Sequence, residues 1–283
     1  MMGTPPWVAG LGDPPIAHAM AEMRPAIDAL GAASAAVMGI YGSGGGDAQK
    51  KADGSPVTEA DLESHRTVSR ALAATGHAIL SEEGPPAALG AGETAWIVDP
   101  LDGTADFVSR TGEFTIMAGL VRSGRPVLGV IAQPAAQAIF VAQDGAGSYR
   151  GHGGSWERLR AGPERGAPEC RAVCSRNHLS DVDRAVLARL GVAETVQVGS
   201  SIKACRIAAN EADIYVTTTD RMKQWDTCAS WCVVTEAGGR MTDALGGELE
   251  YGAGSVAHRH GIIASCGGRI HDLAVGECRA ALG

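Results

Sequence analysis

The stretch from 96 to 107 constrains this chain more than any other, because it changes from large apolar residues to acidic ones within a few positions. Its first three residues, Trp-Ile-Val, indicate the end of a buried strand. The chain turns polar at Asp99 and then reaches Pro100, which cannot donate a hydrogen bond to a neighbouring strand. We therefore expect the strand to stop at Pro100 and the chemistry to lie at its C-terminal edge.

Three oxygen ligands are expected just after this strand. Asp99 and Asp102 are separated by a turn, and the backbone carbonyl of Leu101 can face the same side. Two carboxylates held close together repel each other unless a hard cation neutralises them, and oxygen-only ligation suits Mg²⁺. Gly103 and Thr104 then begin a helix, whose free N–H groups favour an anion. The stretch thus predicts that a metal and a phosphate meet here.

Four motifs in one order give the chain a family resemblance. The hexapeptide DPLDGT at 99–104 is similar to the signature of the lithium-sensitive, Mg²⁺-dependent sugar and nucleotide phosphatases, the inositol monophosphatase superfamily. The other motifs are DGSPVTEAD at 53–61, SEE at 81–83, and WD at 225–226 followed by EAGG at 236–239. Within the family, the stretches SPVT, LSEE, GEFT and GSSIK look most like the bacterial bisphosphate nucleotidase branch.

The order of segments predicts an N-terminal α+β domain over 1–160 and a C-terminal α/β domain over 161–283. In the first, four apolar segments joined by short turns predict antiparallel strands. These segments are 114–121, 127–132, 138–142 and 146–150. Beyond a boundary rich in Gly and Pro at 151–168, strands alternate with helices. The resemblance implies a five-layer αβαβα sandwich, and this order is compatible with it.

Two helices are expected before the acidic stretch. After a disordered start, residues 16–41 show helical spacing, which Pro25 can break into two pieces. Thr58 and Asp61 have the form of a helix cap. The inward-facing residues of this second helix are expected to be Leu62, Val68 and Leu72. For the Gly-rich loop at 42–54, a mobile lid, as the family implies, and a solvated linker are both open.

Composition narrows the classes of function. The chain of 283 residues has 24 Lys and Arg against 32 Asp and Glu, and its net charge of −8 argues against nucleic-acid binding. Its seven cysteines include no C-x-x-C pair, so we expect no disulfide framework or zinc site, and we expect Cys228 and Cys232 to be buried hydrophobes. The start is no secretory signal, and no apolar run approaches the roughly 20 residues of a membrane span. These features predict a cytoplasmic protein.

The resemblance assigns the metal ligands. It implies that Glu82, Asp99 and the Leu101 carbonyl hold one Mg²⁺, while Asp99, Asp102 and Asp226 hold a second, with two or three ions in the site. Asp226 would also contact the substrate. The roles of Asp53 and Glu83, which lie beside the matched positions, stay open.

The resemblance also assigns Asp61 and Thr104 as the pair that orients and deprotonates the attacking water, with in-line inversion and no covalent phospho-enzyme. Read without the other motifs, Asp61 is only a capping residue. The chain contains no G-x-S-x-G elbow and no cysteine in a phosphatase loop, so it offers no activated nucleophile.

The substrate contacts follow from the same match. The N–H groups of Gly103 and Thr104 should hold the scissile phosphate. The positions that match nucleotide contacts in the bisphosphate nucleotidases are His178, Ser200 and Lys203. After the stretch DIYV at 213–216 the nucleotidases typically carry an Arg that holds the second phosphate, whereas this chain has Thr217, so Arg221 or Lys223 is the candidate replacement.

The resulting hypothesis is a Mg²⁺-dependent phosphatase that removes the 3′-phosphate of 3′-phosphoadenosine 5′-phosphate. The alternative is a relative that acts on inositol monophosphate, histidinol phosphate or a specialised nucleotide or sugar phosphate. A third hypothesis is a non-catalytic binding protein on the same fold. The expected partner is a small phosphorylated molecule, and the resemblance implies that this molecule is a nucleotide. The resemblance also implies sensitivity to lithium and allows a homodimer.

Overall fold

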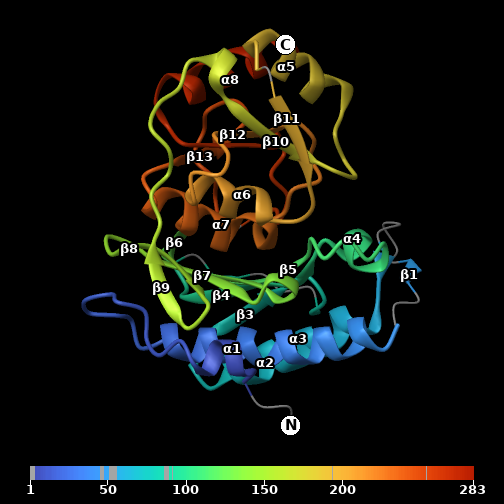
Figure 1. The fold of residues 1–283 in the computed structure, drawn as a ribbon, viewed down its shortest axis with the longest axis vertical. Coiled ribbons are helices and arrows are strands. Elements are labelled where there is room, and N and C mark those ends of the chain that lie inside the picture. The colour runs from blue at the N-terminus through green and yellow to red at the C-terminus, as the bar shows by residue number, and fades with distance from the viewer. Residues whose placement is uncertain are drawn as a thin grey trace.

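Two sheets organise the chain, and helices cover both faces of each (Figure 1). The structure is a computed structural model that describes residues 4–44, 48–50, 56–85, 89–90, 92–192, 194–252 and 254–283. Asp53, together with parts of the loops 42–54 and 84–94, lies outside the described residues.

The first sheet has seven strands in chain order. They are β3 (Ala78–Ser81), β4 (Ala95–Asp102), β5 (Thr115–Arg122), β6 (Arg125–Gln133), β7 (Ala138–Gln143), β8 (Gly147–His152) and β9 (Ser155–Arg158). β3 pairs parallel to β4, and every later pair is antiparallel. The four predicted antiparallel segments are confirmed as β5 to β8, whereas β9 was not predicted, because its short, polar and exposed sequence lacks an apolar pattern.

Three helices lie along one side of the seven-stranded sheet: α1 (Pro6–Ala9), α2 (Met23–Gly42) and α3 (Glu59–Ala73) (Figure 1). The prediction of a helix from residue 16 is wrong, since α2 begins at Met23. Pro25 does not break it, because a proline in the first turn removes an N–H that has no helical partner. Val8 and Leu11 are buried, so the prediction of disorder is wrong for the described part of the start.

The cap of α3 is confirmed, with Thr58 and Asp61 forming a capping box. Val68 and Leu72 are fully buried as predicted, but Leu62 is 43% exposed, so its inward placement is wrong. A short antiparallel pair, β1 (Gln49–Lys50) with β2 (Pro56–Val57), precedes this helix.

The second sheet has five strands in the order β11-β10-β12-β14-β13. They are β10 (Arg171–Ser175), β11 (Glu194–Val198), β12 (Ile214–Thr217), β13 (Arg240–Asp243) and β14 (Ile262–Ser265). Parallel pairing joins β11, β10 and β12, and antiparallel pairing joins β12, β14 and β13. β13 was not predicted, because two of its four residues, Arg240 and Asp243, are charged.

The remaining helices complete the layers. α6 (Ile202–Ala208) and α7 (Gln224–Glu236) lie between the two sheets, and α5 (Asp181–Leu190) and α8 (Gly268–Leu282) cover the far side of the five-stranded sheet (Figure 1). The expected five-layer αβαβα sandwich is confirmed. α4 (Thr104–Val108) is a single short helix at the end of β4.

Glycines let α7 lie close against the seven-stranded sheet. A Cβ atom on Gly129 would lie 2.5 Å from the backbone oxygen of Ala229, and one on Gly119 would lie 2.4 Å from the sulfur of Cys228. Cys228 and Cys232 are buried there, as predicted, and all seven cysteines are free. This close contact brings the N-terminus of α7, which carries Asp226, to the end of β4.

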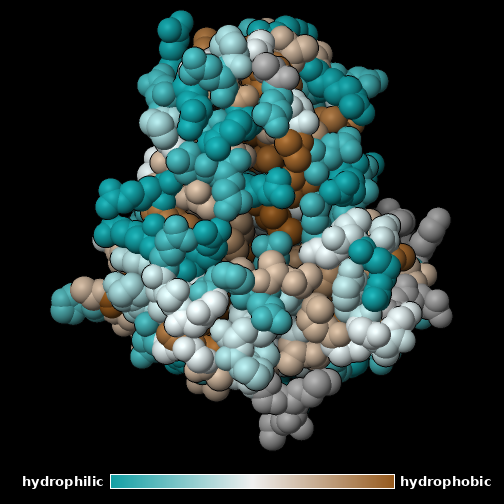
Figure 2. All heavy atoms as spheres, in the orientation of Figure 1, coloured by the Kyte–Doolittle hydropathy of each residue, from teal (hydrophilic) through white to brown (hydrophobic). Residues whose placement is uncertain are grey.

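On the face seen in Figure 2, hydrophilic residues cover most of the upper half, the lower half is largely of intermediate hydropathy, and hydrophobic residues show near the middle, above the place where the two halves meet. Among the described residues, no helix combines the length and the apolar character that crossing a membrane requires.

Candidate active site

A cavity of about 780 Å³ lies between the two sheets, at the C-terminal end of β4. Every residue predicted for the site except Asp61 lines it: Glu82, Asp99, Leu101, Asp102, Gly103, Thr104, His178, Ser200, Lys203 and Asp226. Asp61 lies just behind this wall, in hydrogen-bond contact with Thr104.

Three aspartates meet at the floor of the cavity. One carboxylate oxygen from each of Asp99, Asp102 and Asp226 lies within 4.8 Å of the others. β4 does not stop at Pro100 as predicted, but continues to Asp102 with an irregularity between Asp99 and Asp102. The missing N–H of a proline is tolerated where the ladder is interrupted, and the interruption turns both carboxylates to the same cavity.

Burial and mutual repulsion disfavour the ionised form of this cluster, and a bound cation would relieve both. Burial, and after it the charges of Glu82, Asp102 and Asp226, raise the pKa of Asp99 well above its usual value. Burial and the charges of Asp102 and Glu82 do the same to the pKa of Asp226. Carboxylate and carbonyl oxygens are the donors that Mg²⁺ prefers, so these residues fit the predicted metal.

Asp102 is held in place from the other half of the molecule. The backbone N–H and the hydroxyl of Ser201 donate to the same oxygen of Asp102, at 2.5 and 2.6 Å. The sequence analysis missed Ser201, since nothing in the local pattern separates it from Ser200 beside it. Removal of a group that orients a metal ligand typically lowers metal affinity or activity by about 10- to 100-fold.

The predicted catalytic pair is in contact. The hydroxyl of Thr104 donates to Oδ1 of Asp61 at 2.8 Å and lies 3.2 Å from the carbonyl oxygen of Leu101. The other oxygen of Asp61 accepts from the backbone N–H and the hydroxyl of Thr58, each at 2.7 Å. The capping box that begins α3 therefore also fixes the carboxylate that faces Thr104.

The turn before α4 requires glycine. Gly103 has φ of 92°, and a Cβ atom there would lie 3.0 Å from the carbonyl oxygen of Glu113 and 3.1 Å from Cβ of Ser200. A residue with a side chain would be both strained and crowded at this position. The turn thus brings the backbone of Gly103 and Thr104 to the cavity beside the acidic cluster.

Lys203 and His178 also line the cavity. Lys203 is buried and donates to the carbonyl oxygen of Ser200 at 2.6 Å. Burial lowers the pKa of Lys203, while the charges of Asp102, Asp106 and Asp226 raise it. Partial burial is the main reason that the pKa of His178 is lowered, and the charges of Arg221 and Lys203 add to this effect. The uncharged form of the ring is therefore favoured at neutral pH.

The sequence model of the inositol monophosphatase family matches residues 20–280 of this chain. The chain belongs to this family. It is therefore a phosphatase, as its motifs predicted.

Individual members of the family are similar to this chain over most of its length. The chain is similar to the 3′(2′),5′-bisphosphate nucleotidase CysQ of Salmonella typhimurium, with 34% identity over 76% of this chain and 88% of that protein. Among solved structures, CysQ of Bacteroides thetaiotaomicron covers 89% of this chain and 99% of its own, with 29% identity and a TM-score of 0.74. An inositol monophosphatase of Thermotoga maritima covers 93% of this chain and 98% of its own, with 28% identity and a TM-score of 0.79.

Thr217, where the nucleotidase branch of the family typically has an arginine, lines the cavity, and so do both candidate replacements, Arg221 and Lys223. Lys223 is also the N-cap residue of α7, and its backbone N–H donates to Asp226 at 2.6 Å. Arg221 is exposed at the rim, where its charge acts on His178.

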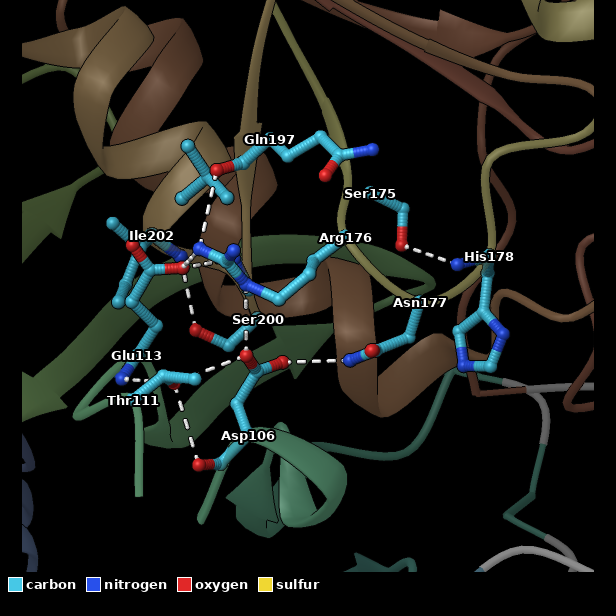
Figure 3. A network of polar contacts seen from close by, with 12 residues as sticks. Asp106, Thr111, Glu113, Ser175, Arg176, Asn177, His178, Gln197, Ser200 and Ile202 are labelled. Carbon is cyan, nitrogen blue, oxygen red and sulfur yellow. Dashed lines mark hydrogen bonds and ion pairs between the residues drawn. The ribbon is translucent and has the colours of Figure 1, made fainter. Parts of the chain in front are cut away.

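A group of polar residues at the rim was also missed by the sequence analysis. Arg176 and Asn177, after β10, contact Asp106 of α4, and Arg176 also contacts Glu113 (Figure 3). These residues are distant in the chain and belong to no shared motif, so only the packing of the two halves brings them together.

Proposed function

We propose that the protein is a Mg²⁺-dependent phosphomonoesterase that removes the 3′-phosphate of 3′-phosphoadenosine 5′-phosphate. One observation carries the proposal: the carboxylate cluster of Asp99, Asp102 and Asp226 and the Thr104–Asp61 pair lie at one cavity. The cluster can hold divalent cations, and the pair can orient and deprotonate a water. A phosphate ester placed between them can be hydrolysed directly.

The metal ligands are assigned as two overlapping sets. Glu82, Asp99 and the Leu101 carbonyl would hold one Mg²⁺, and Asp99, Asp102 and Asp226 a second. When bound, such ions polarise the phosphoryl oxygens and make water more acidic. The two bonds from Ser201 orient Asp102, and ligands held in this way bind an ion with less reorganisation.

The proton path runs through Thr104. Its hydroxyl hydrogen points to Asp61, so its oxygen can accept a hydrogen bond from the attacking water. As the water loses a proton to Thr104 Oγ1, the Thr104 proton can move to Oδ1 of Asp61. The two bonds from Thr58 keep Asp61 in place during this transfer.

The nucleotide substrate is supported by the relatives named as 3′(2′),5′-bisphosphate nucleotidases, at 34% identity. The cavity is also lined by Lys203, His178 and Arg221, which can hold a second anionic group. Thr217 favours a second candidate, a different small phosphomonoester. A relative from Thermotoga maritima, 29% identical, is named a fructose-1,6-bisphosphatase/inositol-1-monophosphatase.

The test is phosphate release from 3′-phosphoadenosine 5′-phosphate and from inositol 1-phosphate, each measured with Mg²⁺ and with a chelator. We expect faster release from the nucleotide, loss of activity in chelator, and loss of activity in Asp99→Asn. Equal or faster release from inositol 1-phosphate would contradict the substrate. Activity that survives both the chelator and Asp99→Asn would contradict the metal mechanism.

A further inference from the structure

Arg176 joins the two halves of the molecule at the rim of the cavity (Figure 3). Its guanidinium lies 3.1 Å from Oδ1 of Asp106 and donates to Oε2 of Glu113 at 2.6 Å. Arg176 follows β10 of the five-stranded sheet, whereas Asp106 lies in α4 and Glu113 just before β5. The Asn177 side-chain amide adds a bond of 2.8 Å to Oδ2 of Asp106.

Asp106 is a buried acid that depends on these partners. It is 1% exposed, and both of its carboxylate oxygens have partners. Oδ1 accepts from the Thr111 hydroxyl at 3.0 Å in addition to its contact with Arg176, and Oδ2 accepts from Asn177. A buried carboxylate that loses its cationic partner is left uncompensated. The contact with Arg176 therefore holds the two halves in one relative position at this rim.

From Glu113 the network reaches the turn that holds Asp102. The same oxygen of Glu113 accepts from the backbone N–H of Gly199 at 2.7 Å. A Cβ atom on Gly199 would lie 2.7 Å from the carboxylate of Asp106, so the turn is pressed against the network. Ser200 follows with φ of 47°, in the left-handed region that a residue with a side chain rarely adopts. Such a conformation persists only where its surroundings enforce it.

The turn ends at Ser201, whose N–H and hydroxyl both hold Asp102. A continuous set of contacts thus runs from Arg176 through Glu113 and Gly199 to a carboxylate of the acidic cluster.

We propose that Arg176 is a positioning residue: by reaching from one half to pair with both Asp106 and Glu113 of the other, it fixes the 199–201 turn and so orients Asp102 for Mg²⁺. The inference rests on the proposed function, because it assumes that Asp102 is a metal ligand. Arg176 itself touches neither the metal nor the reacting phosphate.

The test compares Arg176→Met with Arg150→Met. Arg150 is a matched control, since its side chain is 31% exposed against 34% for Arg176, and it also joins the halves by pairing with Glu157 and Glu211. It does not line the cavity. Calorimetric titration with Mg²⁺ alone, and activity as a function of Mg²⁺ concentration, are measured for both variants.

We expect Arg176→Met to weaken Mg²⁺ binding about tenfold, the lower end of the effect of removing groups that orient metal ligands. Raising Mg²⁺ should restore most of its kcat, and Arg150→Met should match the unaltered protein. Equal Mg²⁺ affinity in the two variants would overturn the proposal, as would a change in melting temperature without a change in Mg²⁺ affinity.

Two further results keep the test decisive. If Arg176→Met does not fold, Glu113→Gln retains the volume and an acceptor for Gly199 but loses the charge that pairs with Arg176, and it should weaken Mg²⁺ binding in the same direction. If the unaltered protein binds Mg²⁺ but hydrolyses neither phosphate ester, the proposed function fails, while the Mg²⁺ titration still decides the role of Arg176. If it binds no Mg²⁺, both proposals are overturned.

Discussion

The hydroxyl of Thr104 donates a hydrogen bond of 2.8 Å to the carboxylate of Asp61, which lies 43 residues earlier in the chain. Asp61 is also the third residue of α3, where it completes the capping box with Thr58. One side chain thus serves both the start of a helix and the rim of the cavity, so its position cannot vary without moving the helix.

Thr104→Val removes the hydroxyl and nearly keeps the shape. We expect kcat to fall by about 10²- to 10⁴-fold, the usual contribution of a positioned proton-transfer group, with little change in KM. Steady-state kinetics on the nucleotide would show this. Thr235→Val is the control, because the Thr235 hydroxyl also bonds a backbone carbonyl but lies on α7 away from the cavity. A Thr104→Val enzyme with unaltered kcat would contradict the proton path.

Asp99→Asn should stabilise the metal-free protein while abolishing activity. The raised pKa of Asp99 means that the folded, metal-free chain binds more protons than the unfolded chain above the usual aspartate pKa. Its stability therefore falls as pH rises, and asparagine escapes this loss. We therefore expect the free energy of unfolding of Asp99→Asn in chelator to exceed that of the unaltered protein at pH 8.

The measurement for Asp99→Asn is urea unfolding in chelator at pH 5 and pH 8, where the gain should be larger at pH 8. Added Mg²⁺ should stabilise the unaltered protein and leave the variant unchanged. The exposed Asp13→Asn serves as the control. A variant less stable than the unaltered protein in chelator would show that the cluster does not repel itself.

Arg221→Ala tests the second anionic contact. We expect KM for 3′-phosphoadenosine 5′-phosphate to rise about tenfold, equivalent to about 1.4 kcal/mol, and KM for inositol 1-phosphate to stay the same. Arg259→Ala, an exposed arginine outside the cavity, is the control. An equal rise for both substrates would argue against a second phosphate at Arg221 and direct attention to Lys223.

Gly129→Ala tests the packing that places α7. The added methyl would meet the backbone of Ala229 at 2.5 Å, and overpacking of this kind costs about 1 to 3 kcal/mol. Gly276→Ala, in the middle of α8 with open space around it, should instead stabilise by about 0.5 to 1 kcal/mol. Thermal unfolding of both variants would decide, and a destabilised Gly276→Ala together with a neutral Gly129→Ala would contradict this account of the packing.

Much of the fold is visible in local patterns. The alternation of apolar segments with turns predicts β5 to β8, and the pattern beyond residue 168 predicts strands that alternate with helices. Where the pattern was weak or misleading the prediction failed, as for β9, β13 and the start of α2. In those segments the sheet or the core, rather than periodicity, decides the conformation, because backbone pairing can stabilise polar strands.

The sequence by itself determined the local parts of the site: the Asp99–Thr104 turn, the Thr58–Asp61 cap and the acidic character of the ligand positions. Only the tertiary structure decided what these parts meet, such as Ser201 on Asp102, 99 residues away, and Arg176 between Asp106 and Glu113. Hydrogen-bonding and steric preferences of this kind act over a few residues, so they follow from the local sequence. Contacts across two sheets depend on how the sheets pack, and that packing is set by the whole core at once.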